Sequence, residues 1–174
     1  MDFGLCLLGK SIVDVTFAEM LNPYGHAMGA MTCANAAEII IKARIAEEHP
    51  LLIFNKLPKT TAKNSGLLGI DELLNEGRTL MYSELPDALW ATTGYRIKNL
   101  QQFKDFGKIR NTITHLAVPN LNLSKETLRF AFQVMKPMVS NFWKSDIFEY
   151  IGRYDPDADE YVHEQLKGYK IKLK

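Results

Sequence analysis

The stretch FKDFGKIRNTITHLAVP, residues 103–119, carries the most regular helical pattern in the chain and is the place where charged residues suited to chemistry gather. Its apolar residues recur at steps of three and four, the spacing that lines up one face of a helix. These residues are Phe106, Ile109, Ile113, Leu116 and Ala117. We therefore expect an amphipathic helix that begins near Asn99, ends at Pro119 and buries this face in a core.

The opposite face of this helix is basic and rich in hydrogen-bonding groups. With a turn of about 100° per residue, the residues on that side are Lys104, Lys108, Asn111 and His115. By the same geometry, Arg110 lies roughly 140° round the helix from His115. One straight helix therefore does not direct Arg110 and His115 at the same point.

The N-terminal part of the chain predicts two more helices. The first runs from about Phe3 to Leu21, where Asn22-Pro23 ends it, and the second runs from Gly25 to Glu48. One face of the second helix carries a stripe of apolar residues, small ones first and branched ones after. The stripe consists of Ala27, Ala30, Ala34, Ala37, Ile41 and Ile45. Because its other sides are also largely apolar, we expect this helix at the centre of a bundle.

The remaining segments predict shorter helices and one long one. LLIFNKLP, residues 51–58, is expected to lie across the core, followed by short helical pieces at 70–75 and 84–91. Ser124 is the expected N-cap of a long helix that Pro137 kinks. No segment shows a convincing strand alternation, so the predicted fold class is all-α, an up-and-down bundle of four or five helices with short additional helices.

The domain organisation follows from composition along the chain. Residues 1–150 are expected to form one helical domain, and residues 151–174 are polar enough to form a peripheral helix or a partly ordered tail. The chain of 174 residues is 47% hydrophobic and 24% charged, as is normal for a soluble globular protein. Its net charge is +1, so affinity for phosphates must come from local clusters of basic residues.

The two cysteines, Cys6 and Cys33, stand among apolar neighbours without metal-ligand spacing. We interpret both as free thiols of a reducing compartment and expect a cytoplasmic protein. The N-terminal apolar run is too short for a signal peptide or a membrane span, so no membrane partner is expected.

Glu38 interrupts the apolar stripe of the second helix. A buried carboxylate is costly unless it is paired. Lys42, one turn later, is one partner at helical spacing. The alternative is that Glu38 holds Arg110 or His115, and the sequence leaves both interpretations open.

Other patterns give weaker signals. Glu160 and His163 have the spacing of helical carboxylate metal sites, but those sites need the motif twice, and it occurs once here. We therefore expect no metal and no cofactor. The aromatic residues of the middle region are interpreted as core rather than as a base-stacking platform. They are Tyr82, Trp90, Tyr95 and Phe103.

The segment Arg110-Asn111-Thr112-Ile113-Thr114-His115 resembles the R-x4-6-H signature of HEPN domains, all-helical nucleotide-binding modules of higher eukaryotes and prokaryotes. Asn111 fits the polar position that follows the arginine in this family. The stretch AAEIIIKARIAEEHPLLIF, residues 36–54, looks like the second helix of these domains, where a glutamate and a lysine one turn apart follow small residues. The resemblance covers about residues 24–145.

Arg44 and His49 repeat the same spacing in RIAEEH. There, Ile45 follows the arginine, two glutamates precede the histidine, and Pro50 closes the helix directly after it. We interpret this copy as a solvated helix end.

The resemblance implies a metal-independent endoribonuclease. Such an enzyme uses the 2′-hydroxyl of RNA as its nucleophile, which needs a proton-transfer group and a fixed cation for the developing phosphorane charge. An imidazole titrates near neutral pH, which suits His115 as base or acid, and the planar cation of Arg110 matches phosphate oxygens. Asn111 is expected to orient the imidazole or bond the phosphate.

The same interpretation assigns supporting roles. Lys104 and Lys108 are expected to bind RNA, and Glu38 and Lys42 to support the site. The angle between Arg110 and His115 predicts a homodimer in which the two chains complete one site, as HEPN relatives do by resemblance.

The resemblance also implies a biological setting, namely a toxin–antitoxin or anti-phage defence system with an antitoxin or another regulatory protein as partner. In toxins regulated by adenylylation a tyrosine stands two residues after the histidine, whereas this chain has Ala117. The alternative to an enzyme is a non-catalytic helical module that uses the same surface for dimerisation or RNA binding within a larger assembly.

Overall fold

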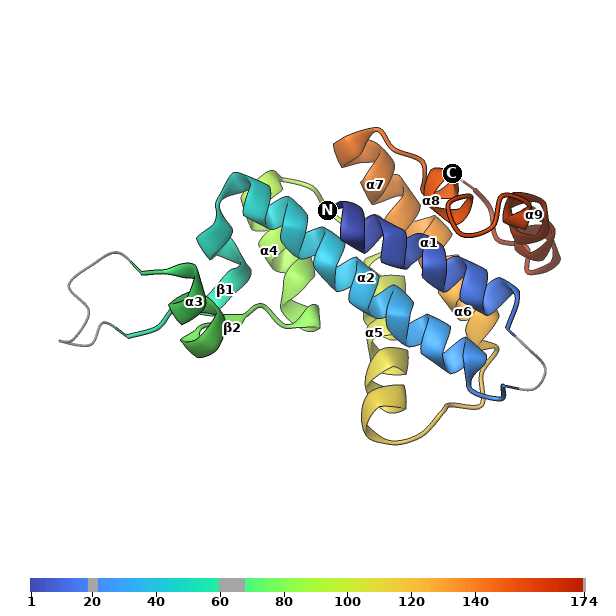
Figure 1. Ribbon diagram of the computed structural model, residues 1–174, viewed down its shortest axis with the longest axis horizontal. Coiled ribbons are helices and arrows are strands. Elements are labelled where there is room, and N and C mark those ends of the chain that lie inside the picture. Colours follow the sequence, from blue (N-terminus) through green and yellow to red (C-terminus); the bar gives the residue numbers. More distant parts are fainter. Residues whose placement is uncertain (19–21, 60–67, 174) are drawn as a thin grey trace.

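In this computed structural model the described residues are 1–18, 22–59 and 68–173, and most of them are helical, which confirms the all-α class. Two antiparallel helices, α1 (Asp2–Thr16) and α2 (Gly25–Glu48), lie side by side across the molecule (Figure 1). The later helices are α4 (Leu85–Thr93), α5 (Leu100–His115), α6 (Leu123–Phe130), α7 (Lys136–Trp143), α8 (Ile147–Ile151) and α9 (Ala158–Gly168).

Helix α2 lies at the centre, as expected from its sequence. It packs against α1, α4, α5 and α6, and each residue of its predicted stripe is buried. Pro23 and Pro50 flank it, and its bounds are those that the sequence predicts. A helix held on several sides gives Glu38 and Lys42 fixed positions beneath the candidate site.

A small antiparallel sheet joins β1 (Phe54–Lys56) and β2 (Arg78–Thr79), although no strand was expected. With α3 (Ile70–Glu76) it forms a unit that projects from one end of the bundle (Figure 1). The prediction that residues 51–58 cross the core is wrong, because Leu51, Leu52 and Leu57 are exposed. The turn η1 (Pro50–Ile53) leads into β1 at the surface instead.

Helix α5 is shorter than predicted. Phe103 and Phe106 are buried against Phe130, as the pattern requires. Leu116, however, is 83% exposed, and Ala117 is exposed too, so their assignment to the core is wrong. The Thr112 carbonyl accepts from the N–H groups of both residues, at 2.9 and 3.0 Å, and this closes the helix at His115.

The long helix after Asn122 is interrupted by a π-helical turn, η3 (Ala131–Met135), between α6 and α7. Pro137 has no N–H to donate to the Gln133 carbonyl four residues earlier. The side-chain amide of Asn99 donates to that carbonyl instead, at 2.9 Å. A π-helical turn thus precedes Pro137, and α5 is tied to this turn at its start, while the kink at Pro137 stays a prediction.

Two helix ends differ from their predictions. The N-cap of α6 is Asn122, whose Oδ1 accepts from the Lys125 N–H at 2.9 Å, while Ser124 is buried and hydrogen-bonds Gln165. Helix α1 ends at Thr16, and the last residues of the predicted helix, 19–21, lie outside the described residues.

The C-terminal segment contains α9, which matches the helical alternative for residues 151–174. This helix packs on α1 and α8 and adds Ala158, Val162 and Leu166 to the main core, and Ile171 after the helix joins them. The domain boundary at residue 150 stays a prediction. Across the described residues, no helix is both long enough and apolar enough to cross a bilayer.

Candidate functional site

A groove of about 760 Å³ runs between the outer face of α5 and the segment that joins β2 to α4. Glu38 of α2 also lines it, whereas Lys42 does not. The groove brings together every site residue that the sequence assigns to α5, namely Lys104, Lys108, Arg110, Asn111 and His115.

The wall opposite α5 was not expected from the sequence. It is formed by the turn η2 (Tyr82–Glu84) and its neighbours, and its apolar members are Leu80, Met81, Tyr82 and Pro86. The groove is therefore asymmetric, with cations on one wall and apolar side chains on the other.

Gly107 lets the two walls approach each other. A Cβ atom at this position would lie 2.7 Å from Cε1 of Tyr82, closer than carbon atoms can pack. A glycine in the middle of an amphipathic helix costs helix stability. This was the one sequence signal for a close neighbour at α5, but it did not identify Tyr82 as that neighbour.

Tyr82 forms the floor of the groove. Its ring stacks on Phe103 with centroids 4.4 Å apart, and its hydroxyl donates to the Phe103 carbonyl at 3.4 Å. Burial raises the pKa of Tyr82 well above its ordinary value, against a smaller opposing effect of the nearby Arg110 cation. The phenol therefore stays neutral and serves as a fixed surface below Arg110.

Arg110 is held by groups on both sides of its guanidinium. Nη2 lies 3.9 Å from Oε2 of Glu38, and Nη1 donates to Oδ1 of Asn111 at 3.2 Å. The side chain is only 28% exposed. Because the cation is permanent and partly withdrawn from water, it presents a fixed positive charge to the groove.

Glu38 has a second cation on its other oxygen. Lys42 donates to Oε1 of Glu38 at 2.7 Å and to the Thr79 hydroxyl at 3.0 Å. The two interpretations of Glu38 therefore hold together, because Glu38 pairs with Lys42 and also with Arg110. A line of contacts runs from Thr79 on β2 through these charges to the groove.

His115 is the last residue of α5 and lies exposed at the rim of the groove. Within the described part of the chain its side chain makes no hydrogen bond, and neither a hydrogen bond nor an ion pair joins it to Arg110. Asn111 bonds Arg110 and not the imidazole. The structure thus brings Arg110 and His115 into one groove but leaves them apart, as the helical geometry requires.

The two lysines of the groove differ in their surroundings. Lys108 forms an ion pair with Asp105 at 2.8 Å, and its hydrogen bond lowers the pKa of that carboxyl. No ion pair of Lys104 occurs among residues 1–18, 22–59 and 68–173. Lys104 is therefore the less neutralised of the two cations.

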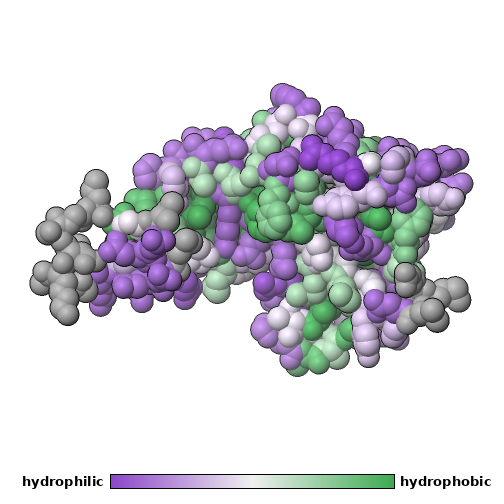
Figure 2. Space-filling model, in the orientation of Figure 1, coloured by the Kyte–Doolittle hydropathy of each residue, from purple (hydrophilic) through white to green (hydrophobic). Residues whose placement is uncertain are grey.

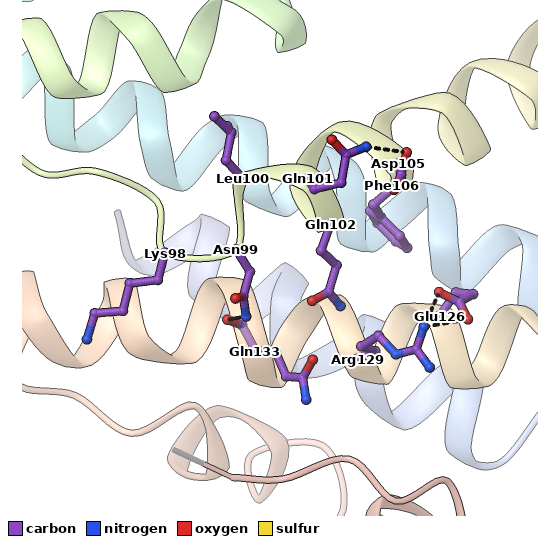
Figure 3. Close-up of a pocket in the computed structure, with 10 residues that line it drawn as sticks. All are labelled: Lys98, Asn99, Leu100, Gln101, Gln102, Asp105, Phe106, Glu126, Arg129 and Gln133. Atoms are coloured by element: carbon purple, nitrogen blue, oxygen red, sulfur yellow. Dashed lines mark hydrogen bonds and ion pairs between the residues drawn. The ribbon is translucent and has the colours of Figure 1, made fainter.

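A second hollow, of about 610 Å³, lies on the other side of α5 against α6 and η3 (Figure 3). Its lining contains two cations, Lys98 and Arg129, and two carboxylates, Asp105 and Glu126, so its formal charges balance. Arg129 pairs with Glu126, whereas the Lys98 side chain points away from both carboxylates (Figure 3). The side chain of Gln102 points from α5 towards the η3 region (Figure 3). Asp105 accepts from Gln101 at 3.0 Å and from Lys108, so it separates this hollow from the groove.

Apolar side chains surround the end of α5 beyond His115. Leu116, Val118 and Leu121 are exposed, and so are Tyr24 and Met28 at the start of α2. Tyr24, Met28 and Val118 of this group line a shallow hollow of about 400 Å³. Figure 2 shows hydrophobic side chains at the surface over this lower end of the molecule.

The weaker patterns of the sequence have structural roles. Arg44 pairs with Glu48 at 2.6 Å, and Nδ1 of His49 accepts from the Leu51 N–H. The ring of His163 stacks on Phe148, with centroids 4.5 Å apart. The aromatic residues largely follow their core assignment, since Phe103 is buried and Tyr82 and Tyr95 pack against the core, but Trp90 is exposed.

Searches of family models, curated proteins and solved structures gave no match to this chain. The class of the protein is therefore argued from its helical fold and from the groove.

Proposed function

We propose that this chain is a metal-independent endoribonuclease of HEPN type that cleaves RNA through attack by the 2′-hydroxyl. The observation that carries the proposal is the gathering of Arg110, Asn111 and His115 in one groove, with Arg110 fixed by Glu38. In this role His115 transfers protons, Arg110 stabilises the phosphorane, and Asn111 bonds a phosphate oxygen. Lys104 and Lys108 hold the RNA backbone.

The proposed reaction balances on these groups alone. The 2′-hydroxyl loses its proton to an imidazole and attacks the adjacent phosphorus, and the P–O5′ bond breaks as the departing O5′ takes a proton from the imidazolium. The products are a 2′,3′-cyclic phosphate and a 5′-hydroxyl. The reaction needs a base, an acid and a fixed cation, which histidine and arginine provide.

We further propose that the active form is a homodimer. The exposed Leu116 directly follows His115, and the exposed Val118 and Met28 line one shallow hollow with Ile113 of α5. A second copy of the chain seated on this surface buries it and brings another Arg110 towards His115. Two-fold dimers are the commonest oligomers, and such an interface is self-complementary. The toxin or defence setting and a regulatory partner are proposed on the family resemblance alone.

One observation favours a second candidate, a non-catalytic dimerisation or RNA-binding module. In the described structure no group orients the imidazole of His115, whereas a catalytic histidine is usually fixed by a hydrogen bond. In this alternative the cationic wall of the groove binds RNA, and the protein does not cleave it.

The deciding experiment incubates the purified chain with total RNA and with tRNA in EDTA. Cleavage is expected with the wild type and is lost in Arg110→Ala and His115→Ala, whose helicity by circular dichroism stays unchanged. Arg44→Ala and His49→Ala are matched controls, because they alter the same spacing outside the groove. Activity that EDTA abolishes and magnesium or manganese restores rejects the mechanism, and binding without cleavage favours the module.

A further inference from the structure

Trp90 is an unusual residue on α4, because it is 46% exposed although tryptophan is normally a core residue. Its neighbours Leu85 and Leu89 on the same helix are fully buried. They fix α4 against the bundle, so the indole is held at the surface by a rigid element.

Arg96 covers part of this indole. Gly94 ends α4 with a left-handed backbone, at φ 74°, and its N–H donates to the Trp90 carbonyl at 2.8 Å. The reversed chain carries the Arg96 guanidinium to 4.4 Å from the centroid of the Trp90 ring. Within the described residues Arg96 has no ion pair, so its charge is open to a phosphate.

Helical spacing places Trp90 close to the side of α4 that forms the groove wall. Pro86 lines the groove, and Trp90 follows it by four residues, about 40° round the helix and about 6 Å along its axis. Met81, also exposed, lines the same wall. A strand whose phosphates rest on α5 can therefore direct its bases over Met81 and Pro86 towards Trp90.

We propose that Trp90 and Arg96 form a base-stacking subsite for the RNA strand where it leaves the groove. Nucleobases stack on aromatic faces and on guanidinium planes without sequence preference, and the Arg96 cation that lies over the Trp90 ring adds a contact to the neighbouring phosphate. The ligand class is a single-stranded segment, because only unpaired bases have a free face to stack. This subsite rests on the proposed function, in which RNA occupies the groove.

The chain's own fluorescence provides the test. It contains two tryptophans, and Trp143 donates its indole N–H to Glu47, outside the groove. In a Trp143→Phe, His115→Ala chain, Trp90 is the only tryptophan and RNA is not cleaved. Single-stranded RNA is expected to quench its emission, whereas inorganic polyphosphate at equal charge leaves the emission unchanged. Equal quenching by both, or bound RNA without quenching, overturns the subsite.

Binding measurements in the His115→Ala background give a second readout. Trp90→Leu is expected to weaken binding of single-stranded RNA about tenfold, while Trp90→Phe keeps most of the affinity. The slope of affinity against salt stays the same, since no cation is removed. Tyr154→Leu, at a similarly exposed aromatic residue after α8, is the control. An unchanged affinity in Trp90→Leu contradicts the proposal.

The subsite and the nuclease can fail separately. Quenching of Trp90 by RNA without any cleavage by the wild-type chain supports the subsite and rejects the nuclease. Cleavage by the wild type without quenching supports the nuclease and rejects the subsite.

Discussion

Glu38 is the only carboxylate of the described residues that forms an ion pair with the Arg110 guanidinium, with Nη2 and Oε2 3.9 Å apart. Its second oxygen is bonded by Lys42, so its position is set from α2 and β2. A catalytic cation gains most of its effect from being placed before the substrate arrives. In the proposed nuclease, Glu38 therefore acts by positioning Arg110 rather than by contact with RNA.

Replacing Glu38 with glutamine is expected to lower kcat for RNA cleavage by about tenfold or more, because Arg110 loses its fixed position. KM is expected to change little, since the lysines of the groove remain. Steady-state kinetics measure both values. Glu47→Gln is the matched control, because Glu47 pairs with Arg44 on the same helix outside the groove. An unaltered kcat in Glu38→Gln contradicts the positioning role.

The two groove lysines are expected to contribute unequally to RNA binding. Lys104 lacks an ion pair among the described residues, whereas Lys108 is partly neutralised by Asp105. Lys104→Ala should therefore reduce the slope of log affinity against log salt by about one, and Lys108→Ala should reduce it by less. Fluorescence anisotropy across a salt series measures the slopes. Unchanged slopes in the double variant place the RNA elsewhere.

At the scale of single residues the sequence identified one side of the site. Periodicity placed Lys104, Lys108 and His115 on one face of a helix, and all three line the groove. Periodicity could not identify Met81 or Pro86 as groove residues. Which side chains of that segment face α5 depends on packing between parts of the chain that are distant in sequence. The close approach of Tyr82 to Gly107 is of the same kind.

At the scale of elements, flanking residues decided which helix bounds were predicted well. Prolines bracket α2, and its predicted bounds are confirmed. The end of α5 was placed too late, because Leu116 and Ala117 continue the apolar spacing although the backbone has already left the helix. Apolar residues at helical spacing share one face only within the helix itself. The exposed end of α5 then becomes a surface that can meet a partner.

The contact between Asn99 and the Gln133 carbonyl joins the start of α5 to the π-helical turn η3. Asn99→Ala is expected to lower the free energy of unfolding by about 1–3 kcal/mol, because the carbonyl loses its donor. In a Pro137→Ala background the cost should be smaller, since the alanine N–H can serve that carbonyl. Urea denaturation of the four chains measures the coupling. Equal costs in both backgrounds contradict this explanation of the turn.

At the scale of the whole molecule, the composite site predicts complementation between chains. Arg110→Ala and His115→Ala chains are each expected to be inactive, and subunit exchange between them should restore part of the activity. A mixed dimer keeps one intact pairing of His115 with the partner's Arg110. Activity of the mixture, beside each chain alone, measures the effect.

Leu116→Glu supplies the control for this experiment. A charge on the apolar surface beside His115 should produce monomers in analytical ultracentrifugation and prevent complementation. Demonstrated mixed dimers without recovered activity, or a wild-type monomer at the working concentration, contradict the composite site.

The central claim, RNA cleavage by 2′-hydroxyl attack in the groove, is tested most directly by the ends of the products. A labelled single-stranded RNA is incubated with the wild-type chain in EDTA, and the fragments are examined by mass spectrometry beside the His115→Ala chain. We predict fragments with 2′,3′-cyclic phosphate and 5′-hydroxyl ends from the wild type and intact RNA from the variant. Fragments with 3′-hydroxyl and 5′-phosphate ends, or equal cleavage by His115→Ala, would contradict the claim.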